Sequence, residues 1–287
     1  MDDFSAASML AALGDGRYRW DVPDGWQQGK GAFGGLVLGA LARAMEGCEP
    51  DRQRRLRSLT GDLCAPMLPG PAELTSTILR RGSGATYVEA RAVQGGQTIA
   101  RASALLGVAR PPSALRLAVS PPVLPPLEEV AVVRMGQPPT PRFAAHFELR
   151  PVGPLPFFGA REPVAAGYLR LMPPPDDSAG PPGGPVGSVG PVGPGGSAAR
   201  APDAAEVIAL LDAWWPCALV VEPQPRGMAT VTFAAELIAD PAELDATSPF
   251  AYCAELAGAA DGYSVELRQL WQGGRLVALN QQVFAAL

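Results

Sequence analysis

Two stretches of the chain alternate apolar and polar positions in the way that is typical of β-strands with one buried face. In each stretch the last two runs are separated by a Gly-Gly pair, which favours a tight hairpin turn. The pattern therefore predicts two similar groups of antiparallel strands. The predicted strands cover residues 56–64, 71–81, 85–94 and 97–109 in the first group, and residues 227–238, 250–258, 262–271 and 275–285 in the second.

Each group of strands follows a segment that is apolar on nearly every side, which predicts a buried helix. The first such segment is residues 31–45, and its early glycines suit a helix start where the backbone approaches a neighbour or a ligand. The second is residues 204–215, with Asp203 as the expected N-cap and Pro216 as the stop. Each half is therefore expected to be one central helix followed by four antiparallel strands.

The two halves also match residue by residue. Residues 94–104 and 272–282 each place a Gly-Gly turn between apolar runs, and residues 84–91 precede their turn at the same distance as residues 262–269. Self-similarity of this kind marks an internal repeat. The sequence thus predicts one structural unit built twice in tandem.

The remaining segments set the expected domain boundaries. We expect an N-terminal unit at 1–110, a proline-rich extended linker at 111–141 and a C-terminal unit at 142–287. Residues 173–201 are dominated by Gly, Pro, Ser and Val, which predicts a disordered insertion. Residues 1–30 are interpreted as loop-like, and strand-like runs are expected at 143–150 and 165–172.

Composition limits the possible partners. The net charge is −5 and no long basic run is present, so we expect neither nucleic acid nor an anionic membrane as a partner. No apolar run reaches roughly 18–20 residues, so no membrane span is expected. Because the chain starts without a signal-peptide pattern, we expect a cytoplasmic protein. The one basic cluster is interpreted as solvated, with binding of a CoA phosphate as the alternative; it comprises Arg52, Arg54, Arg55 and Arg57.

The reactive residue types argue against a metal centre. The single histidine, His146, excludes any mechanism that needs two histidines or a histidine–metal cluster, and is expected to be a structural strand residue. We expect no metal and no cofactor. The cysteines lack the CxxC spacing of a zinc site and do not form a disulfide framework; they are Cys48, Cys64, Cys217 and Cys253.

Four short motifs occur in a specific order along this repeat. They are Phe33-Gly-Gly35, Leu211-Asp-Ala213 followed by Pro216, Met228-Ala-Thr230, and Leu276-Val-Ala278 followed by Gln282. Together they make the chain resemble the acyl-CoA thioesterase II family and its thioesterase-like relatives, over nearly everything outside residues 173–201. The resemblance implies an α+β fold, the double hotdog, in which two tandem repeats each wrap an antiparallel β-sheet around a central helix.

The resemblance also implies catalytic residues. In that family an aspartate, a hydroxyl residue and a glutamine orient the water that attacks the thioester, and these roles fall on Asp212, Thr230 and Gln282. Thr232 stays open as the alternative hydroxyl, whereas Gln281 is expected to face away from Gln282 because strand side chains alternate. An aspartate in the middle of an apolar helix is energetically unfavourable, which suggests that it is there for a function. Partial burial would raise its pKa and make it a better base.

The two helices are incomplete in complementary ways. The first carries Gly34 and Gly35 at its start but no acid later, whereas the second carries Asp212 but no Gly-Gly pair. We therefore expect one composite site per chain, with the Gly34 and Gly35 amides near the substrate carbonyl and Asp212 supplied by the other half. The pseudo-symmetric second site is expected to be inactive.

The expected activity is hydrolysis of acyl thioesters of CoA or of an acyl carrier protein. A non-catalytic hotdog protein that binds acyl thioesters or a partner is the first alternative, and a hotdog hydratase or dehydratase is the second. Asp62 and Glu266 are interpreted as ordinary strand carboxylates. Because sheet edges of such proteins are usually covered by association, we expect a homo-oligomer.

Overall fold

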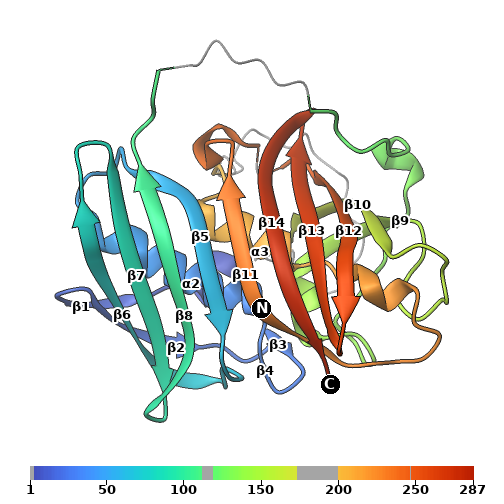
Figure 1. Cartoon of the computed structure of the whole chain (residues 1–287), viewed down its shortest axis with the longest axis horizontal. Helices are drawn as coiled ribbons and strands as arrows, with labels where there is room; N and C mark the ends of the chain where they lie inside the picture. The colour runs from blue at the N-terminus through green and yellow to red at the C-terminus, as the bar shows by residue number, and fades with distance from the viewer. Residues whose placement is uncertain (1–2, 112–118, 173–199, 246) are drawn as a thin grey trace, which may run out of the picture.

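A computed structural model describes residues 3–111, 119–172, 200–245 and 247–287, and its main feature is one sheet of twelve antiparallel strands. All eight strands of the two predicted groups are present (Figure 1). Those of the first group are β5 (Arg55–Leu63), β6 (Gly70–Arg81), β7 (Ala85–Gln94) and β8 (Gln97–Gly107). Those of the second are β11 (Met228–Leu237), β12 (Phe250–Ala260), β13 (Tyr263–Gln272) and β14 (Arg275–Ala286).

The two halves share the sheet through the pairing of β5 with β11. The strand order is β1-β2-β6-β7-β8-β5-β11-β14-β13-β12-β10-β9, so each half contributes one edge. β1 (Ala11–Gly14) and β2 (Arg17–Val22) form the first edge, and β9 (Phe147–Val152) and β10 (Val164–Leu171) form the second. The backbone ladder is therefore continuous from one repeat to the other.

The N-terminal segment differs from its expected loop-like character. It contains the short helix α1 (Phe4–Ala7), strands β1 and β2, and a small hairpin of β3 (Gln27–Gln28) and β4 (Gly31–Ala32). The described connections contain four short 3₁₀ helices: η1 (Leu127–Glu129), η2 (Arg142–His146), η3 (Cys217–Val220) and η4 (Pro241–Glu243). His146 thus lies at the end of η2, just before β9, and not in a strand.

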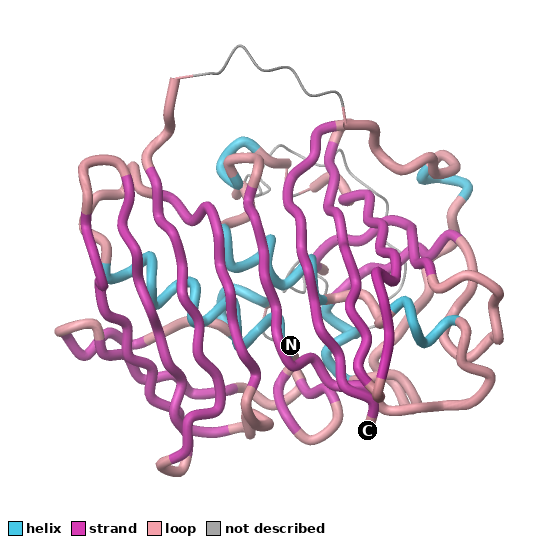
Figure 2. Tube along the Cα trace, viewed as in Figure 1, coloured by secondary structure: helices cyan, strands magenta, loops and turns pink. Residues whose placement is uncertain are grey.

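Two buried helices lie across one face of the sheet, α2 (Gly34–Cys48) and α3 (Ala204–Asp212) (Figure 2). They run antiparallel, because Gly35 lies against Ala209 while Gly39 lies against Ala205. A Cβ on Gly35 would come within 2.9 Å of the Ala209 Cα, so glycine is what allows this close helix contact. The double hotdog arrangement is therefore confirmed, with its two central helices in direct contact.

The bounds of α3 correct one expectation about Asp212. Asp203 is the N-cap, as predicted, and forms a capping box with Glu206. The helix ends at Asp212 and does not continue through Trp215. Asp212 is therefore a C-terminal residue of the helix, where the helix dipole disfavours a negative charge.

The tandem repeat extends to the irregularities of the strands. The β6–β7 ladder shifts register after Ile78 and the β12–β13 ladder after Leu256, while the β7–β8 ladder shifts after Ala92 and the β13–β14 ladder after Leu270. Leu256 follows Ile78 by the same number of residues as Leu270 follows Ala92. Positions in the two halves can therefore be equated one by one.

The expected domain boundaries stay predictions. The predicted insertion at 173–201 lies almost wholly outside the described residues, as does part of the linker predicted at 111–141. Among the residues that the structure describes, no helix is long and apolar enough to cross a membrane.

Candidate active site

The carboxylate of Asp212 lies at the junction of the two halves. Its residue is only 6% exposed, although it stands at the end of α3. A Cβ built on Gly34, at the start of α2, would come within 2.8 Å of Asp212 Oδ2. The structure thus brings the acid of one half against the first turn of the other half's helix, as the composite site requires.

Gln282 connects Asp212 to a hydroxyl on the neighbouring strand. From β14 its Nε2 donates one hydrogen bond to Asp212 Oδ1, at 2.6 Å, and another to Thr230 Oγ1, at 2.7 Å. A primary amide has only two N–H donors, so both are used. The three predicted site residues therefore converge on a single amide group.

A β-bulge decides which threonine takes part. The ladder between β11 and β14 shifts so that Thr230 lies opposite Phe284 while Thr232 lies opposite Val283. Because Phe284 shares the inner face with Gln282, the bulge turns Thr230 inward and leaves Thr232 on the outer face. Thr230, the hydroxyl implied by the family resemblance, is the threonine at the site.

Burial controls the ionisation of Asp212. Desolvation raises the pKa of its carboxyl group from 3.8 to about 6, and three neighbours oppose this shift. The opposing groups are the Arg268 guanidinium, the Gln282 amide and the backbone N–H of Gly35. The Gly35 amide thus faces the carboxylate, and a substrate oxygen would share this donor.

Several hydrogen-bonding groups around Gln282 are buried but unpartnered. Asp212 Oδ2 and Gln282 Oε1 have no hydrogen-bond partner within the described part of the chain. The Thr230 oxygen accepts from Gln282, which leaves its own hydrogen available to donate. Buried polar atoms normally find a partner, so this grouping indicates the place of a water or a substrate group.

The equivalent positions of the other half are apolar. Leu56 of β5 corresponds to Thr230 of β11, because each lies next to the bulge of its strand. Ala104 corresponds to Gln282, because the two occupy matching places in their ladders. Ala42 corresponds to Asp212, because each is the ninth residue of its helix. No acid, hydroxyl or amide therefore stands at these three positions. We expect the second site to be inactive for this reason.

The sequence interpretation missed a buried ion pair on β13. Glu266 was expected to be an ordinary strand carboxylate, but it is fully buried and its Oε2 lies 2.9 Å from Arg268 Nη2. Glu266 and Arg268 face inward, while Leu267 between them is 43% exposed. The sequence contains no signal for this pair, because alternation shows that a strand has two different faces but not which face is buried.

The other residues noted in the sequence make structural contacts away from Asp212. His146 stacks on Trp26 with ring centroids 3.7 Å apart, and its Nε2 is 3.2 Å from the Gly25 oxygen. Asp62 forms a partly exposed ion pair with Arg101 at 2.6 Å. All four cysteines are free, and the described residues contain no group of three or more His, Cys, Asp and Glu side chains able to hold a metal ion.

The predicted basic cluster is not uniformly solvated. Arg54 is only 7% exposed and donates to Thr86 Oγ1 at 2.8 Å and to the Gly82 oxygen at 2.9 Å. Arg55 pairs with Asp240. Arg52 and Arg57 each donate a longer hydrogen bond, at 3.3 Å, to a backbone oxygen of the chain.

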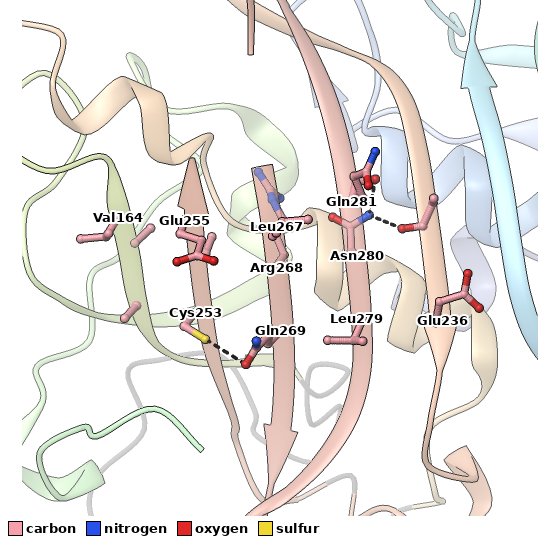
Figure 3. A pocket seen from close by; sticks show the side chains of 14 residues that line it. Val164, Glu236, Cys253, Glu255, Leu267, Arg268, Gln269, Leu279, Asn280 and Gln281 are labelled. Carbon is pink, nitrogen blue, oxygen red and sulfur yellow. Dashed lines mark hydrogen bonds between the residues drawn. The ribbon is translucent and has the colours of Figure 1, made fainter. Parts of the chain in front are cut away.

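A groove of about 520 Å³ lies on the outer face of the C-terminal half of the sheet (Figure 3). Leu267, Leu279 and Gln281 are among its lining residues, and they alternate along their strands with the inward-facing Arg268 and Gln282. Most of its exposed lining therefore belongs to the outer face of the sheet, opposite Asp212, although the lining also includes Arg268, whose guanidinium lies on the inner face.

Two family models match this chain in the order of its two halves. The acyl-CoA thioesterase N-terminal domain matches residues 22–107, and the acyl-CoA thioesterase C-terminal domain matches residues 194–286. The chain belongs to the acyl-CoA thioesterase family. Gly34 and Gly35 lie in the first matched domain, whereas Asp212, Thr230 and Gln282 lie in the second.

Solved structures share the fold of this chain along almost its whole length. A conserved hotdog-fold protein of unknown function from Alicyclobacillus acidocaldarius is 22% identical, with a TM-score of 0.83 over 99% of this chain and 97% of that one. An acyl-CoA thioesterase II from Mycobacterium marinum is 18% identical, with a TM-score of 0.69 over 99% and 98% of the two chains. The search of curated proteins found no match to this chain.

Proposed function

We propose that this chain hydrolyses acyl thioesters of coenzyme A or of an acyl carrier protein, with Asp212 as the base that activates the attacking water. The observation that carries this proposal is the Gln282 amide, which holds Asp212 and Thr230 together beside the first turn of α2. Membership of the acyl-CoA thioesterase family supports the reaction class.

The unpartnered groups define how a water would be held. One water hydrogen is donated to Asp212 Oδ2, and the Thr230 hydroxyl donates to one of the two lone pairs of the water. The second lone pair is then left for the thioester carbonyl carbon, which is the orientation that nucleophilic attack needs. Gln282 fixes Asp212 Oδ1 at 2.6 Å and so keeps Oδ2 available as the proton acceptor.

The reaction follows from this placement. The water oxygen forms a bond to the carbonyl carbon, its proton passes to Asp212, and the carbonyl electrons move onto the oxygen. The Gly34 and Gly35 amides are the proposed donors to that oxyanion, because the first N–H groups of a helix have no intrahelical partner. Collapse of the intermediate breaks the C–S bond, and the thiolate leaves and takes up a proton.

The raised pKa of Asp212 suits this role. A carboxyl group with a pKa of about 6 is ionised at neutral pH and still accepts a proton more readily than an ordinary aspartate. A hydratase or dehydratase would instead use His146 with an acid, but this ring is stacked on Trp26 and its Nε2 is directed at the Gly25 oxygen. The homo-oligomer and the cytoplasmic location stay predictions.

The direct test uses the purified full chain with acyl-CoA substrates from short to long chains, followed by release of free thiol. The same acyl groups on an acyl carrier protein identify the preferred carrier, and hydration of enoyl-CoA is measured in parallel. We expect hydrolysis, and a loss of roughly 10²–10⁴-fold in kcat/KM in Asp212→Asn. Full activity in that variant would refute the assigned base, and binding without turnover in the unmodified protein would favour the non-catalytic alternative.

A further inference from the structure

The ion pair of Glu266 and Arg268 lies directly behind the candidate site. Both side chains are completely buried. Arg268 donates from Nε and Nη2 to Glu266 Oε2, at 3.2 and 2.9 Å. In the ladder between β13 and β14, Glu266 lies opposite Gln282, so the pair occupies the inner face next to the amide that holds Asp212.

The same arginine binds the backbone at the end of α3. Its Nη1 donates to the Leu211 oxygen at 3.1 Å and to the Trp214 oxygen at 3.4 Å, which are carbonyl groups on either side of Asp212. The last carbonyls of a helix have no intrahelical partner, and a basic side chain is a suitable one. Arg268 thus fixes the short backbone segment from which the Asp212 carboxylate projects.

Glu266 extends this attachment beyond the helix. Its Oε1 accepts a hydrogen bond from the Ala218 N–H at 3.3 Å, while its Oε2 is used by Arg268. The ion pair therefore contacts the chain at the end of α3 and again in η3, where Ala218 lies. The position of Asp212 is set by side chains of β13 as well as by Gln282.

The other half of the chain shows that the fold does not need this ion pair. At the matching positions of β7 stand Val88 and Ala90, both buried on the inner face. That half also lacks an acid on its helix. A buried ion pair contributes little to net stability, because desolvation offsets its attraction. Its presence only in the half that carries Asp212 points to a function at the site.

We propose that Arg268, held in place by Glu266, is the positioning residue of the Asp212 site, where it fixes the end of α3 and keeps the carboxylate charged at neutral pH. The proposal rests on the proposed function for its catalytic meaning. The titratable and charged groups facing this region are Arg268 and Glu266 from β13, Tyr252 from β12 and Cys217 from η3. Desolvation raises the pKa of Asp212, and Arg268 is the strongest influence that lowers it.

The test replaces the whole pair with apolar side chains of similar size, in Glu266→Leu/Arg268→Met. Removing both charges avoids the large penalty of leaving one buried charge unpaired. We expect a folded protein in which kcat/KM at neutral pH falls at least about tenfold, mostly because the end of α3 is no longer fixed. A rise of about one unit in the pKa of Asp212 would contribute about twofold of this loss, and that part should be recovered at higher pH. A structural role alone would lower activity equally at every pH.

A second variant separates charge from positioning. Arg268→Lys keeps the buried positive charge, but an ammonium group cannot make the same planar set of bonds to Glu266 and to both carbonyls. In this variant the acid limb of the pH profile of kcat/KM should stay near that of the unmodified protein, while kcat falls. Arg275→Met is the matched control, because it removes an exposed ion pair with Glu243 at the start of β14. It should change neither quantity.

The ionisation of Asp212 is also measured without turnover. NMR of protein labelled with ¹³C at the aspartate carboxyl groups follows its titration, with Asp212→Asn used to assign the signal. A folded double variant whose Asp212 titrates at the same pH as in the unmodified protein overturns the electrostatic role, and unchanged kcat in Arg268→Lys overturns the positioning role. If the unmodified protein hydrolyses no thioester, the proposed function is refuted, and the NMR titration still decides whether Arg268 controls the charge of Asp212.

Discussion

Gly34 and Asp212, which belong to different halves of the chain, are in such close contact that a Cβ on the glycine would come within 2.8 Å of Asp212 Oδ2. The contact places the free N–H groups of one helix beside the acid at the end of the other. A single added methyl group at this point would therefore disturb the site without altering any polar residue.

Gly34→Ala is expected to displace the Asp212 carboxylate and lower kcat/KM by about tenfold to a hundredfold, because small errors in the position of a catalytic group are costly. Steady-state kinetics would measure this change, with circular dichroism to confirm folding. Gly258→Ala is the control, since a Cβ at that position in β12 meets no atom within 4 Å. Unchanged kinetics in Gly34→Ala would contradict the composite site.

Thr230→Val and Thr232→Val make the same chemical change on the two sides of the bulge in β11. We expect the first to lower kcat/KM by about tenfold, which corresponds to the loss of one hydrogen bond to the oriented water. The second should stay within about twofold, because Thr232 faces away from Gln282. Equal losses in the two variants would argue against Thr230 as the site hydroxyl.

The pH dependence of hydrolysis should follow the carboxyl group of Asp212. The base must be ionised, so kcat/KM is expected to rise with pH and to level off above a pKa of about 6. A profile of kcat/KM against pH at constant ionic strength would measure it. An acid limb near pH 4, the value of an ordinary aspartate, would show that Asp212 is not the titrating group.

Asp212 should also make the folded protein less stable at high pH. Its folded pKa of about 6 lies above the ordinary value of 3.8, so the folded state binds this proton more tightly, and ionisation destabilises the folded state as pH rises between these values. Above about pH 6 the cost is about 3 kcal/mol, and below about pH 4 it disappears. Asp212→Asn should therefore raise the free energy of unfolding more at pH ~8 than at pH ~5.

Urea denaturation at the two pH values would measure this difference, with Asp261→Asn as the control. Asp261 is exposed in the turn before β13 and adopts φ 53°, a conformation that asparagine tolerates. It should show no such dependence on pH. A loss of stability in Asp212→Asn at high pH would contradict the desolvation of this carboxylate.

The strands and the repeat were predictable because alternation and Gly-Gly turns are local signals. β1 and β2 were not, since they are short and are joined by a tight turn in which Asp15 and Gly16 both have positive φ. The end of α3 was also missed, because the apolar pattern continues through Ala213, Trp214 and Trp215 after the helix has stopped. Tertiary contacts, including the bonds from Arg268, determine that end.

At the site, the sequence identified the residues that the Gln282 amide brings together but not their surroundings. The choice between Thr230 and Thr232 depended on a bulge, which adds one residue and reverses the alternation without any mark in the local sequence. The ion pair of Glu266 and Arg268 was overlooked because charged residues alternating with Val265 and Leu267 normally face solvent. In β13 the charged residues are buried and Leu267 is exposed, and this reversal of the usual pattern indicates a function.

The pairing of β5 with β11 within one polypeptide has an evolutionary consequence. In a dimer of identical single repeats, one codon would specify both members of every related pair of positions, so an acid at the end of one helix would be duplicated in the other. Fusion after gene duplication removes that coupling. Because Ala42 and Asp212 are specified by separate codons in this chain, the two related positions carry an apolar residue in one half and an acid in the other.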